Sequence, residues 1–338
     1  MYPYTKSTHS GAHLRLFASV LFALAISVAG CAGPKTGLDH GAFTIVMLPD
    51  TQIYSKAYPD LFYAQTRWIR ANRDRENIKC VTHVGDIVND CVKDPEQWDV
   101  ADKAMAVLDG VVPYGVAIGN HDYEGRSSAV AFVKYFGPDR YKGRPWYRGA
   151  SENKLSSCQL FSGGGVDFVI LHLEIDVPDP TIEWAIDVLR MYPDRAAIVS
   201  THAYLKGRDG VARNTKPAYD KRGNSGEEVW DKLIRRNPQI FMVLCGHEGR
   251  TEEYHQISKN DAGNRVVEML ADYQKRSNGG EGWLRLIRFV PSSRQIQVRT
   301  YSPALGQFET DSNSQFTVPW DLPDMCRRNS RLPLAVGG

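Results

Sequence analysis

Several features that would place this chain of 338 residues in a specialised class are missing from it. It has no internal repeat, no long low-complexity segment and no Cys-x-x-Cys pair, so a cysteine-liganded zinc site is not expected. The chain also lacks an excess of charge of either sign, because its 41 Lys and Arg residues are balanced by 39 Asp and Glu residues. This balance argues against a polyanion binder held by bulk charge, and no specific nucleic-acid binding is predicted. With 42% hydrophobic residues the chain has enough apolar material for a sizeable core.

The N-terminus carries an apolar run that is too short for a comfortable transmembrane helix. Leu16–Val28 holds no charged residue and follows Lys6 and Arg15, as in the apolar part of a secretory signal. The run leads into "SVAGC", which resembles a bacterial lipoprotein signal that is cleaved before Cys31 and lipidated on that residue. The alternative is an ordinary signal peptide followed by an incidental cysteine.

Cleavage before Cys31 predicts how the chain is organised. Residues 1–30 form the signal peptide, and residues 31–41 form the lipidated N-terminus and a tether. We therefore expect an exported lipoprotein anchored in a membrane of the cell envelope. No convincing linker divides residues 42–325, which we interpret as one domain, and residues 326–338 as a C-terminal tail.

The five cysteines beyond the lipidation site are an odd number. Cys80 and Cys245 lie in apolar runs and are expected in the core. Cys91, Cys158 and Cys326 are candidates for disulfide bonds in an oxidising compartment, but the sequence defines no pairing.

Apolar strand-like runs alternate with segments of helical periodicity. In the first part, strands are expected at Phe43–Leu48, Ile78–Val84 and Val111–Gly119, and helices at Leu61–Arg75 and Pro95–Gly110. Later strands are expected at Leu155–Phe161, Val166–Leu173, Ala197–Thr201, Ile240–Cys245, Glu252–Ile257, Arg265–Leu270, Trp283–Val290 and Gln295–Tyr301, and helices at Thr181–Met191 and Gly226–Arg236. This order predicts an α/β fold of two packed mixed β-sheets flanked by helices, in four layers.

Side chains capable of binding a metal follow five of the expected strands. They are Asp50 in "PDTQ", Asp86 in "GDIVN", Asn120 to Asp122 in "GNHD", His202 in "THAY" and His247 in "GHEGR". Each alone has an ordinary explanation as a helix cap, a turn residue or a core histidine. Ligands of open α/β sheets bind beyond the carboxyl ends of the strands, so the five together predict one site.

The order of these motifs resembles that of the calcineurin-like metallophosphoesterases. That family has D-x-H, G-D-x-x-[DN], G-N-H-[DE], an isolated histidine and G-H-x-H, where this chain has D-x-Q, G-D-x-x-N, G-N-H-D, His202 and G-H-x-G within residues 42–303. The resemblance implies two divalent or trivalent metal ions (Mn, Fe or Zn), bridged by Asp86 and a water or hydroxide that hydrolyses a phosphomono- or phosphodiester. It also implies that Asn120, His202 and His247 complete the second metal's ligands, and that Asp50 binds the first metal.

The resemblance implies catalytic roles for two further residues. His121 would reach the scissile phosphate and protonate the leaving oxygen or stabilise its charge. Asp122 would orient and charge that imidazole. The alternative for His121 is a cap after a tight turn.

Two imidazoles of the family pattern are missing, and both belong to the first metal. Gln52 stands at one position and Gly249 at the other. The first site keeps Asp50, Asp86 and, through its amide oxygen, Gln52, which would make it a harder site suited to Mn or Mg. Alternatively, Gln52 only replaces a hydrogen bond.

The segment "LADYQKRSNGGEGW" is the place to look for a replacement ligand. Asp272 is an accessory candidate there, although a turn or helix residue is the more common explanation for such an aspartate. Arg276 and Lys275 are candidates for contact with a substrate phosphate, although exposed basic residues are usually only solvated. His83, His172 and His255 lie in strand-like runs and are interpreted as structural.

Two functions are open at this point. The first is an exported, lipid-anchored, metal-dependent phosphoesterase that acts on a small phosphoester or a nucleotide. The second is a non-catalytic metal- or ligand-binding lipoprotein that keeps the fold and one metal. The two missing imidazoles favour the second function, whereas the presence of Asp86, Asn120 and His121 favours the first.

Overall fold

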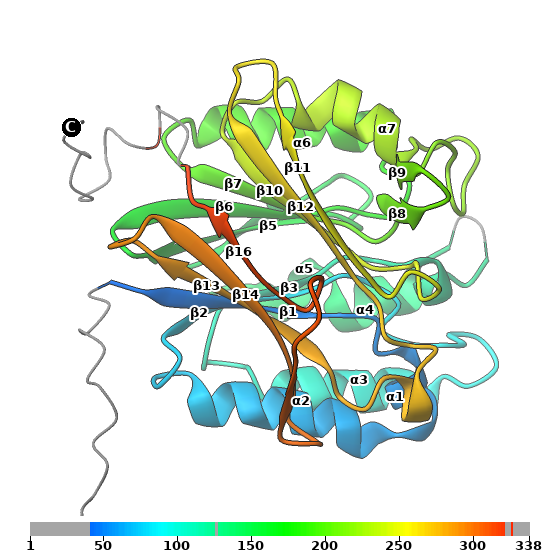
Figure 1. Cartoon of the computed structure of the whole chain (residues 1–338). Coiled ribbons are helices and arrows are strands. Elements are labelled where there is room, and N and C mark those ends of the chain that lie inside the picture. The colour runs from blue at the N-terminus through cyan, green and yellow to red at the C-terminus, as the bar shows by residue number, and fades with distance from the viewer. Residues whose placement is uncertain (1–40, 126–127, 322–325, 327–338) are drawn as a thin grey trace, which may run out of the picture. The chain divides into compact units, whose positions relative to one another are not determined.

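The computed structural model describes residues 41–125, 128–321 and 326. The expected signal peptide, Cys31 and nearly all of the expected tether and C-terminal tail lie outside these residues. Two seven-stranded mixed sheets and a two-stranded sheet, with helices around them, make up the described part (Figure 1). None of its helices is long and apolar enough to cross a lipid bilayer.

The first sheet has the strand order β15-β14-β13-β1-β2-β3, with β16 paired to β14. Strands β1 (Phe43–Leu48), β2 (Ile78–His83) and β3 (Tyr114–Val116) are parallel, and α1 (Gln52–Ala57), α2 (Pro59–Asn72) and α3 (Glu96–Ala106) connect them. The antiparallel part consists of β13 (Leu284–Val290), β14 (Gln295–Ser302), β15 (Gln307–Glu309) and β16 (Gln315–Pro319).

The second sheet has the order β11-β12-β10-β7-β6-β5-β4. Its central strands β6 (Val166–His172), β7 (Ala196–Ser200), β10 (Ile240–Cys245) and β12 (Arg265–Ala271) are parallel. Antiparallel strands β4 (Tyr147–Ala150), β5 (Ser157–Gly163) and β11 (Glu253–Lys259) flank them. Between the parallel strands run α6 (Asp179–Met191), the hairpin β8–β9 (Leu205–Arg208 and Val211–Arg213), and α7 (Gly226–Val229), which continues as a π-helix, η2 (Trp230–Ile234).

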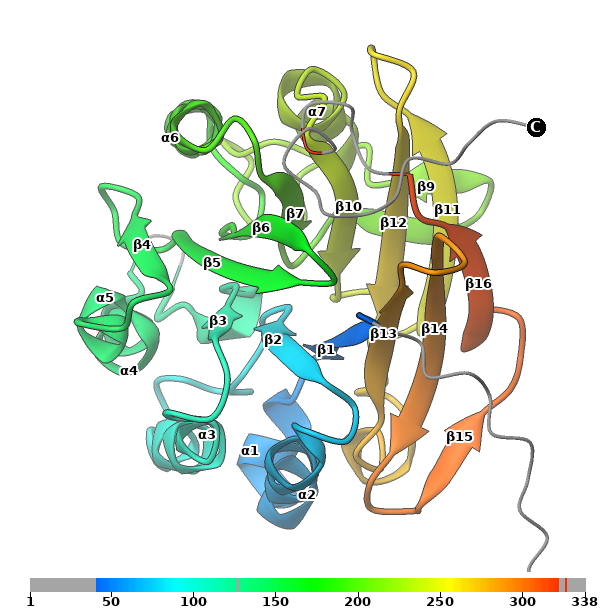
Figure 2. The ribbon, with the colours of Figure 1, turned by 90° about the vertical axis from the view of Figure 1, so that its left-hand side faces the viewer.

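Three apolar clusters hold the layers together. Phe43 and Phe289 stack at 4.6 Å between the sheets, in a cluster that includes Phe168 and Phe241. A second cluster lies between the first sheet and helices α1 to α3, and a third between the second sheet and helices α6 and α7. Figure 2 shows the helices on the outer face of each sheet, so the expected four-layer α/β arrangement is confirmed.

Some expected elements differ from the structure. The strand expected at Val111–Gly119 is only three residues long, because Gly119 to Asp122 turn into a short 3₁₀ helix, η1 (Asn120–Asp122). The helix expected at Gly226–Arg236 changes from α to π after Val229. Further short elements were not expected from the sequence: α4 (Val130–Phe136), α5 (Pro138–Tyr141) and η3 (Ser277–Gly279).

The three cysteines considered as candidates for disulfide bonds form none among the described residues. Cys91, Cys158 and Cys326 are free and buried, as are Cys80 and Cys245. The first three cannot meet, because each lies in a different one of the three apolar clusters. Burial raises the pKa of each of their thiols, which keeps them in the unreactive protonated form.

Candidate metal centre

The two sheets bring their carboxyl ends together at one side of the domain. Asp50 follows β1, Asp86 follows β2 and Asn120 follows β3, while His202 follows β7 and His247 follows β10. Backbone hydrogen bonds tie the ends to one another: Val84 N donates to Leu48 O, and Gly246 N donates to His202 O. The five segments that the sequence predicted to meet therefore do lie together.

His202 lies at the centre of one group of polar atoms. Its Nε2 lies 3.3 Å from Asp86 Oδ2, 3.2 Å from Asn120 Oδ1 and 3.2 Å from His247 Nδ1. Its Nδ1 lies 2.9 Å from the carbonyl oxygen of Val84. A carbonyl oxygen only accepts, so Nδ1 carries a proton, and Nε2 is the atom that faces the group.

These four side chains fit a metal ion. Asp86, His202 and His247 each offer a ligand atom, and those atoms lie within 4.8 Å of one another. Bonds of about 2.1 Å to a tetrahedral ion separate neighbouring ligands by roughly 3.4 Å, which is close to the distances around His202 Nε2. Asn120 Oδ1 and Asp86 Oδ2 accept only, so a cation or a proton on Nε2 is needed to hold them there.

The glycines of the motifs are explained by how closely the site residues approach them. A Cβ built on Gly119 would lie 2.2 Å from Asp86 Oδ1, and one on Gly246 would lie 2.1 Å from Asp50 Oδ1. The residues beside them are also constrained, because Asp86 and His247 have positive φ angles of 50° and 75°. Such conformations in residues other than glycine concentrate at functional sites.

The His121 imidazole is oriented by a backbone carbonyl. Its Nδ1 lies 2.7 Å from Asn89 O and therefore carries a proton, and its Nε2 has no hydrogen-bond partner in the described part of the chain. The expectation that Asp122 orients this ring is wrong. Asp122 is fully buried and accepts hydrogen bonds from the amides of Ile87 (2.9 Å), Val88 (3.1 Å) and Gly119 (2.8 Å), so it shapes the loops instead.

A second group of polar residues surrounds Asp50. The side-chain amide nitrogen of Gln274 lies 2.9 Å from Asp272 Oδ2 and 3.3 Å from Asp50 Oδ2. Gln52 Nε2 donates to Gln274 Oε1, while Gln52 Oε1 is buried and has no partner among the described residues. Asp272 is fully buried directly after β12, and its Oδ1 accepts from the backbone amide of Gln274 at 3.0 Å, so it is a turn residue that also lies at the site.

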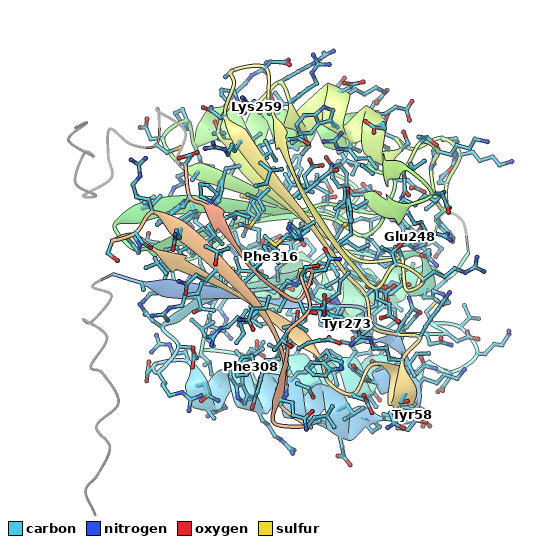
Figure 3. The ribbon with its side chains drawn as sticks, in the orientation of Figure 1. Tyr58, Glu248, Lys259, Tyr273, Phe308 and Phe316 are labelled. Atoms are coloured by element: carbon cyan, nitrogen blue, oxygen red, sulfur yellow. The ribbon has the colours of Figure 1, made fainter. Side chains whose placement is uncertain are left out.

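Gln274 is a residue of this site that the sequence analysis did not single out. A signal was present: "D-x-Q" occurs at Asp50–Gln52 after β1 and again at Asp272–Gln274 after β12. The residue between the second pair, Tyr273, points into the core between the two sheets (Figure 3). The flanking carboxylate and amide of that segment face the site.

The charges of the site are buried together. Burial, and then the charge of Asp272, raises the pKa of Asp50 well above its ordinary value. Burial raises the pKa of Asp272 to about 6. Burial alone would lower the pKa of His202, but the carboxylates of Asp86 and Asp50 outweigh it and raise this pKa. The pKa of His247 is lowered to about 4 by burial and by His202.

Other candidate residues have structural partners. Arg276 forms ion pairs with Glu252 at 2.9 Å and with Glu309 at 2.8 Å, so the expectation that it contacts a substrate phosphate is not supported. Lys275 is exposed. The three histidines interpreted as structural contact protein groups: His83 contacts Thr51, His172 contacts Gln159 and Thr82, and His255 contacts Asn313 and stacks on Phe316.

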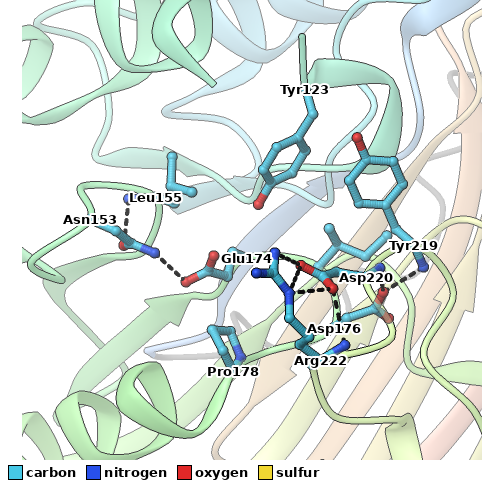
Figure 4. Close-up of a pocket in the computed structure, with 11 residues that line it drawn as sticks. Tyr123, Asn153, Leu155, Glu174, Asp176, Pro178, Tyr219, Asp220 and Arg222 are labelled. Carbon is cyan, nitrogen blue, oxygen red and sulfur yellow. Dashed lines mark hydrogen bonds and ion pairs between the residues drawn. The ribbon is translucent and has the colours of Figure 1, made fainter. Parts of the chain in front are cut away.

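A cavity of about 370 Å³ is lined by residues of the loops that follow β3 and β6 and of the loop before α7. Its wall includes Tyr123, two residues after His121, and Glu174, whose carbonyl accepts from the Thr201 hydroxyl next to His202. The ring centroids of Tyr123 and Tyr219 lie 5.2 Å apart at one side of the cavity, and Arg222 lies opposite them (Figure 4).

Comparison with known proteins agrees with this geometry. A family model described as calcineurin-like phosphoesterase matches residues 43–251. The uncharacterized protein YvnB of Bacillus subtilis (strain 168) is 37% identical over 292 residues, which cover 83% of this chain and 22% of YvnB. The chain thus matches only about a fifth of that relative's length, 22%.

Two solved structures share the fold at low sequence identity. A dimetal phosphatase from Danio rerio has a TM-score of 0.50 and 13% identity, with 83% of this chain and 100% of that one covered. GAP50, the anchor in the inner membrane complex of Plasmodium, has a TM-score of 0.51 and 12% identity, with 87% and 96% covered. From the family match, the fold and the arrangement of the strand-end motifs together, this chain belongs to the calcineurin-like phosphoesterase family.

Proposed function

We propose that the chain hydrolyses phosphomono- or phosphodiesters at the site formed by the strand ends. The observation that carries the proposal is the convergence of Asp86 Oδ2, Asn120 Oδ1 and His247 Nδ1 on His202 Nε2. These four residues would hold one metal ion, and Asp86 would be shared with a second ion held by Asp50. Oxygen and imidazole ligands suit Mn, Fe or Zn.

Metal ions bound there would neutralise the charge of the phosphoryl oxygens and lower the pKa of a water molecule to near neutral. The protein positions the other participants. The backbone amide of His121 donates to Asp86 Oδ1 at 2.9 Å. This hydrogen bond fixes the residue that carries the imidazole next to the shared carboxylate. Because Nδ1 is held by Asn89 O, the Nε2 atom is the one available to give a proton to a leaving oxygen or to stabilise its charge.

We assign the cavity beside Tyr123 to the organic part of the substrate. The lining contains three carboxylates, those of Glu174, Asp176 and Asp220, and one guanidinium, that of Arg222, which pairs with Asp220. Such a lining disfavours a second phosphate group and favours an uncharged or cationic group that contacts the tyrosine rings. A small phosphoester or a nucleoside monophosphate has this character.

The proposal is tested by turnover of a phosphomonoester and a phosphodiester with added Mn²⁺, Fe²⁺ or Zn²⁺. Turnover that disappears with a chelator and returns with one of these metals is the expected result. A protein that binds metal and hydrolyses neither class of ester would instead have the binding-only function, the second candidate, to which the missing imidazoles point. The cavity is tested separately: Tyr219→Ala should raise KM more for a nucleoside monophosphate than for methyl phosphate.

Export and lipid anchoring are proposed on the sequence of residues 1–31 alone. The expected result is a protein in the membrane fraction whose mature mass includes a lipid on Cys31. Cys31→Ser should release it from that fraction without changing turnover. Retention of the unprocessed mass would contradict the proposal.

A further inference from the structure

We propose that the first metal site of this chain is made of oxygen ligands only, with Asp272 in the place of the imidazole missing at Gly249, and that it takes a hard divalent cation such as Mn²⁺ or Mg²⁺. The inference rests on the proposed function for the neighbouring histidine-containing site. It goes further by assigning two ligands, Asp272 and Gln52, and a positioning residue, Gln274.

The space beside Gly249 contains the Asp272 carboxylate. A Cβ built on Gly249 would lie 3.1 Å from Asp272 Oδ2 and 3.1 Å from Gln274 Cγ. The Asp272 carboxylate therefore lies in the direction that a side chain at position 249 would take. Loss of the imidazole and the presence of this carboxylate are two aspects of one replacement.

Gln52, at the other replaced position, has a buried oxygen without a partner in the described part of the chain. Gln52 is 2% exposed, and its amide lies against Gln274, which in turn contacts Asp50 and Asp272. Its Oε1 atom is buried with no partner among the described residues. Burying a polar atom without a partner is unfavourable, and a cation beside these carboxylates would supply the partner.

The carboxylates of the first site are buried with little positive charge beside them. Asp50, Asp86 and Asp272 are each no more than 1% exposed. Among the described residues, their only ion-pair partner is His202, which contacts Asp86, and neither Lys nor Arg pairs with any of them. Asp50 and Asp272 share the side-chain amide of Gln274, and buried carboxylates held next to each other in this way need positive charge nearby. Carboxylate and amide oxygens are the ligands that hard cations prefer.

Gln274 acts on the site by positioning. Its side-chain Nε2 donates to both Asp50 and Asp272, and its backbone amide donates to Asp272 Oδ1 at 3.0 Å. These contacts fix both carboxylates, as hydrogen-bonded neighbours of metal ligands commonly do. The competing possibility is that the Gln274 amide takes the place of the first ion, in which case the chain binds one metal.

Another acidic group in the chain provides a control. Glu253, Glu309 and Asp311 also lie close together. Their oxygens already have partners: Arg285 and Thr300 for Glu253, Arg276 for Glu309, and the amides of Asn313 and Ser314 for Asp311. We therefore expect no ion there.

The experiment is a Mn²⁺ titration of the full chain after its metals have been removed with a chelator. Calorimetry measures the binding, and electron paramagnetic resonance measures the coupling between the bound ions. Two ions per chain with magnetic coupling between them are expected for the unchanged protein. Asp272→Asn should weaken one of the two sites by at least about tenfold and remove the coupling. Gln52→Leu, a second variant that leaves every carboxylate in place, should weaken the same site, and Asp311→Asn should leave both unchanged.

Some outcomes overturn the inference. One ion per unchanged chain at millimolar Mn²⁺, or two ions that neither Asp272→Asn nor Gln52→Leu weakens, would do so. The proposed function fails on a different measurement, because it requires His247→Ala to remove the other ion and the unchanged protein to hydrolyse a phosphoester.

Discussion

The rings of His202 and His247 meet edge to face at 74°, with His202 Nε2 3.2 Å from His247 Nδ1. This contact follows from the sheet, because the strands that precede the two residues, β7 and β10, are parallel neighbours with Ser200 opposite Leu244. The register sets the ends of the two strands side by side, and His202 follows two residues after Ser200 while His247 follows three residues after Leu244. Neither side chain alone defines a metal site, and the pairing of the strands creates it.

The shared carboxylate gives the first prediction. Asp86→Asn should lower turnover by more than about 100-fold and reduce the content of both metals, because the carboxylate contacts His202 and would serve both ions. Metal analysis and turnover of a phosphodiester measure this. Asp311→Asn is the control. Full turnover in Asp86→Asn would refute its assigned place.

The second prediction separates proton transfer from metal binding. His121→Ala should lower kcat by about 10²–10⁴-fold while metal content is kept, because Nε2 of this residue contacts no other described group. The loss should be larger for an alkyl leaving group than for p-nitrophenol, which leaves without a proton. Equal losses for both leaving groups would indicate that His121 has a structural role.

A third prediction concerns the close packing beneath the site. Gly119→Ala places a methyl group where Asp86 Oδ1 now lies, since a Cβ there would be 2.2 Å from that atom. The carboxylate must move, so the rise in melting temperature on metal addition should shrink or vanish. Thermal unfolding with and without Mn²⁺ measures the change. An unchanged response to metal would show that Asp86 binds from another position.

The fourth prediction uses a histidine away from the site. His172 is fully buried, contacts Thr82 at 3.0 Å and Gln159 at 2.6 Å, and burial lowers its pKa to about 3. In the unfolded chain the group takes up a proton below about pH 6.5. The stability that the neutral His172 contributes is therefore complete above pH 6.5 and falls as the pH drops towards 3, by on the order of 5 kcal/mol in total.

His172→Gln tests this linkage. The variant should be less stable than the unchanged protein at pH 8, because it loses the two side-chain contacts. That deficit should shrink as the pH falls to 4, since only the unchanged protein must keep an imidazole neutral. Urea unfolding at several pH values measures the difference. A deficit that stays constant with pH would contradict the buried neutral state of His172.

The sequence predicts the fold and the meeting of the motifs better than it predicts the individual contacts of the site. The alternation of apolar runs predicted the two sheets and their helices, because strand and helix periods are local properties. The motif order predicted that Asp50, Asp86, Asn120, His202 and His247 meet. The sequence did not reveal that His121 Nδ1 donates to Asn89 O, or that the Asp122 carboxylate accepts from three backbone amides. Those hydrogen bonds depend on the path of the backbone. It also left Asp272 undecided, since its burial depends on the pairing of β12 with β10.

The last prediction concerns the exchange of Gly249 and Asp272. If Asp272 fills the place of the missing imidazole, Gly249→His alone should disrupt the site, because its Cβ would lie 3.1 Å from Asp272 Oδ2. Asp272→Ala alone should weaken the first ion. The double variant should bind that ion better than either single variant and should favour Zn²⁺ over Mg²⁺, because an imidazole has replaced an oxygen ligand. Calorimetric titration of the four proteins gives the coupling between the two positions. Additive effects would mean that residues 249 and 272 do not share one place at the metal.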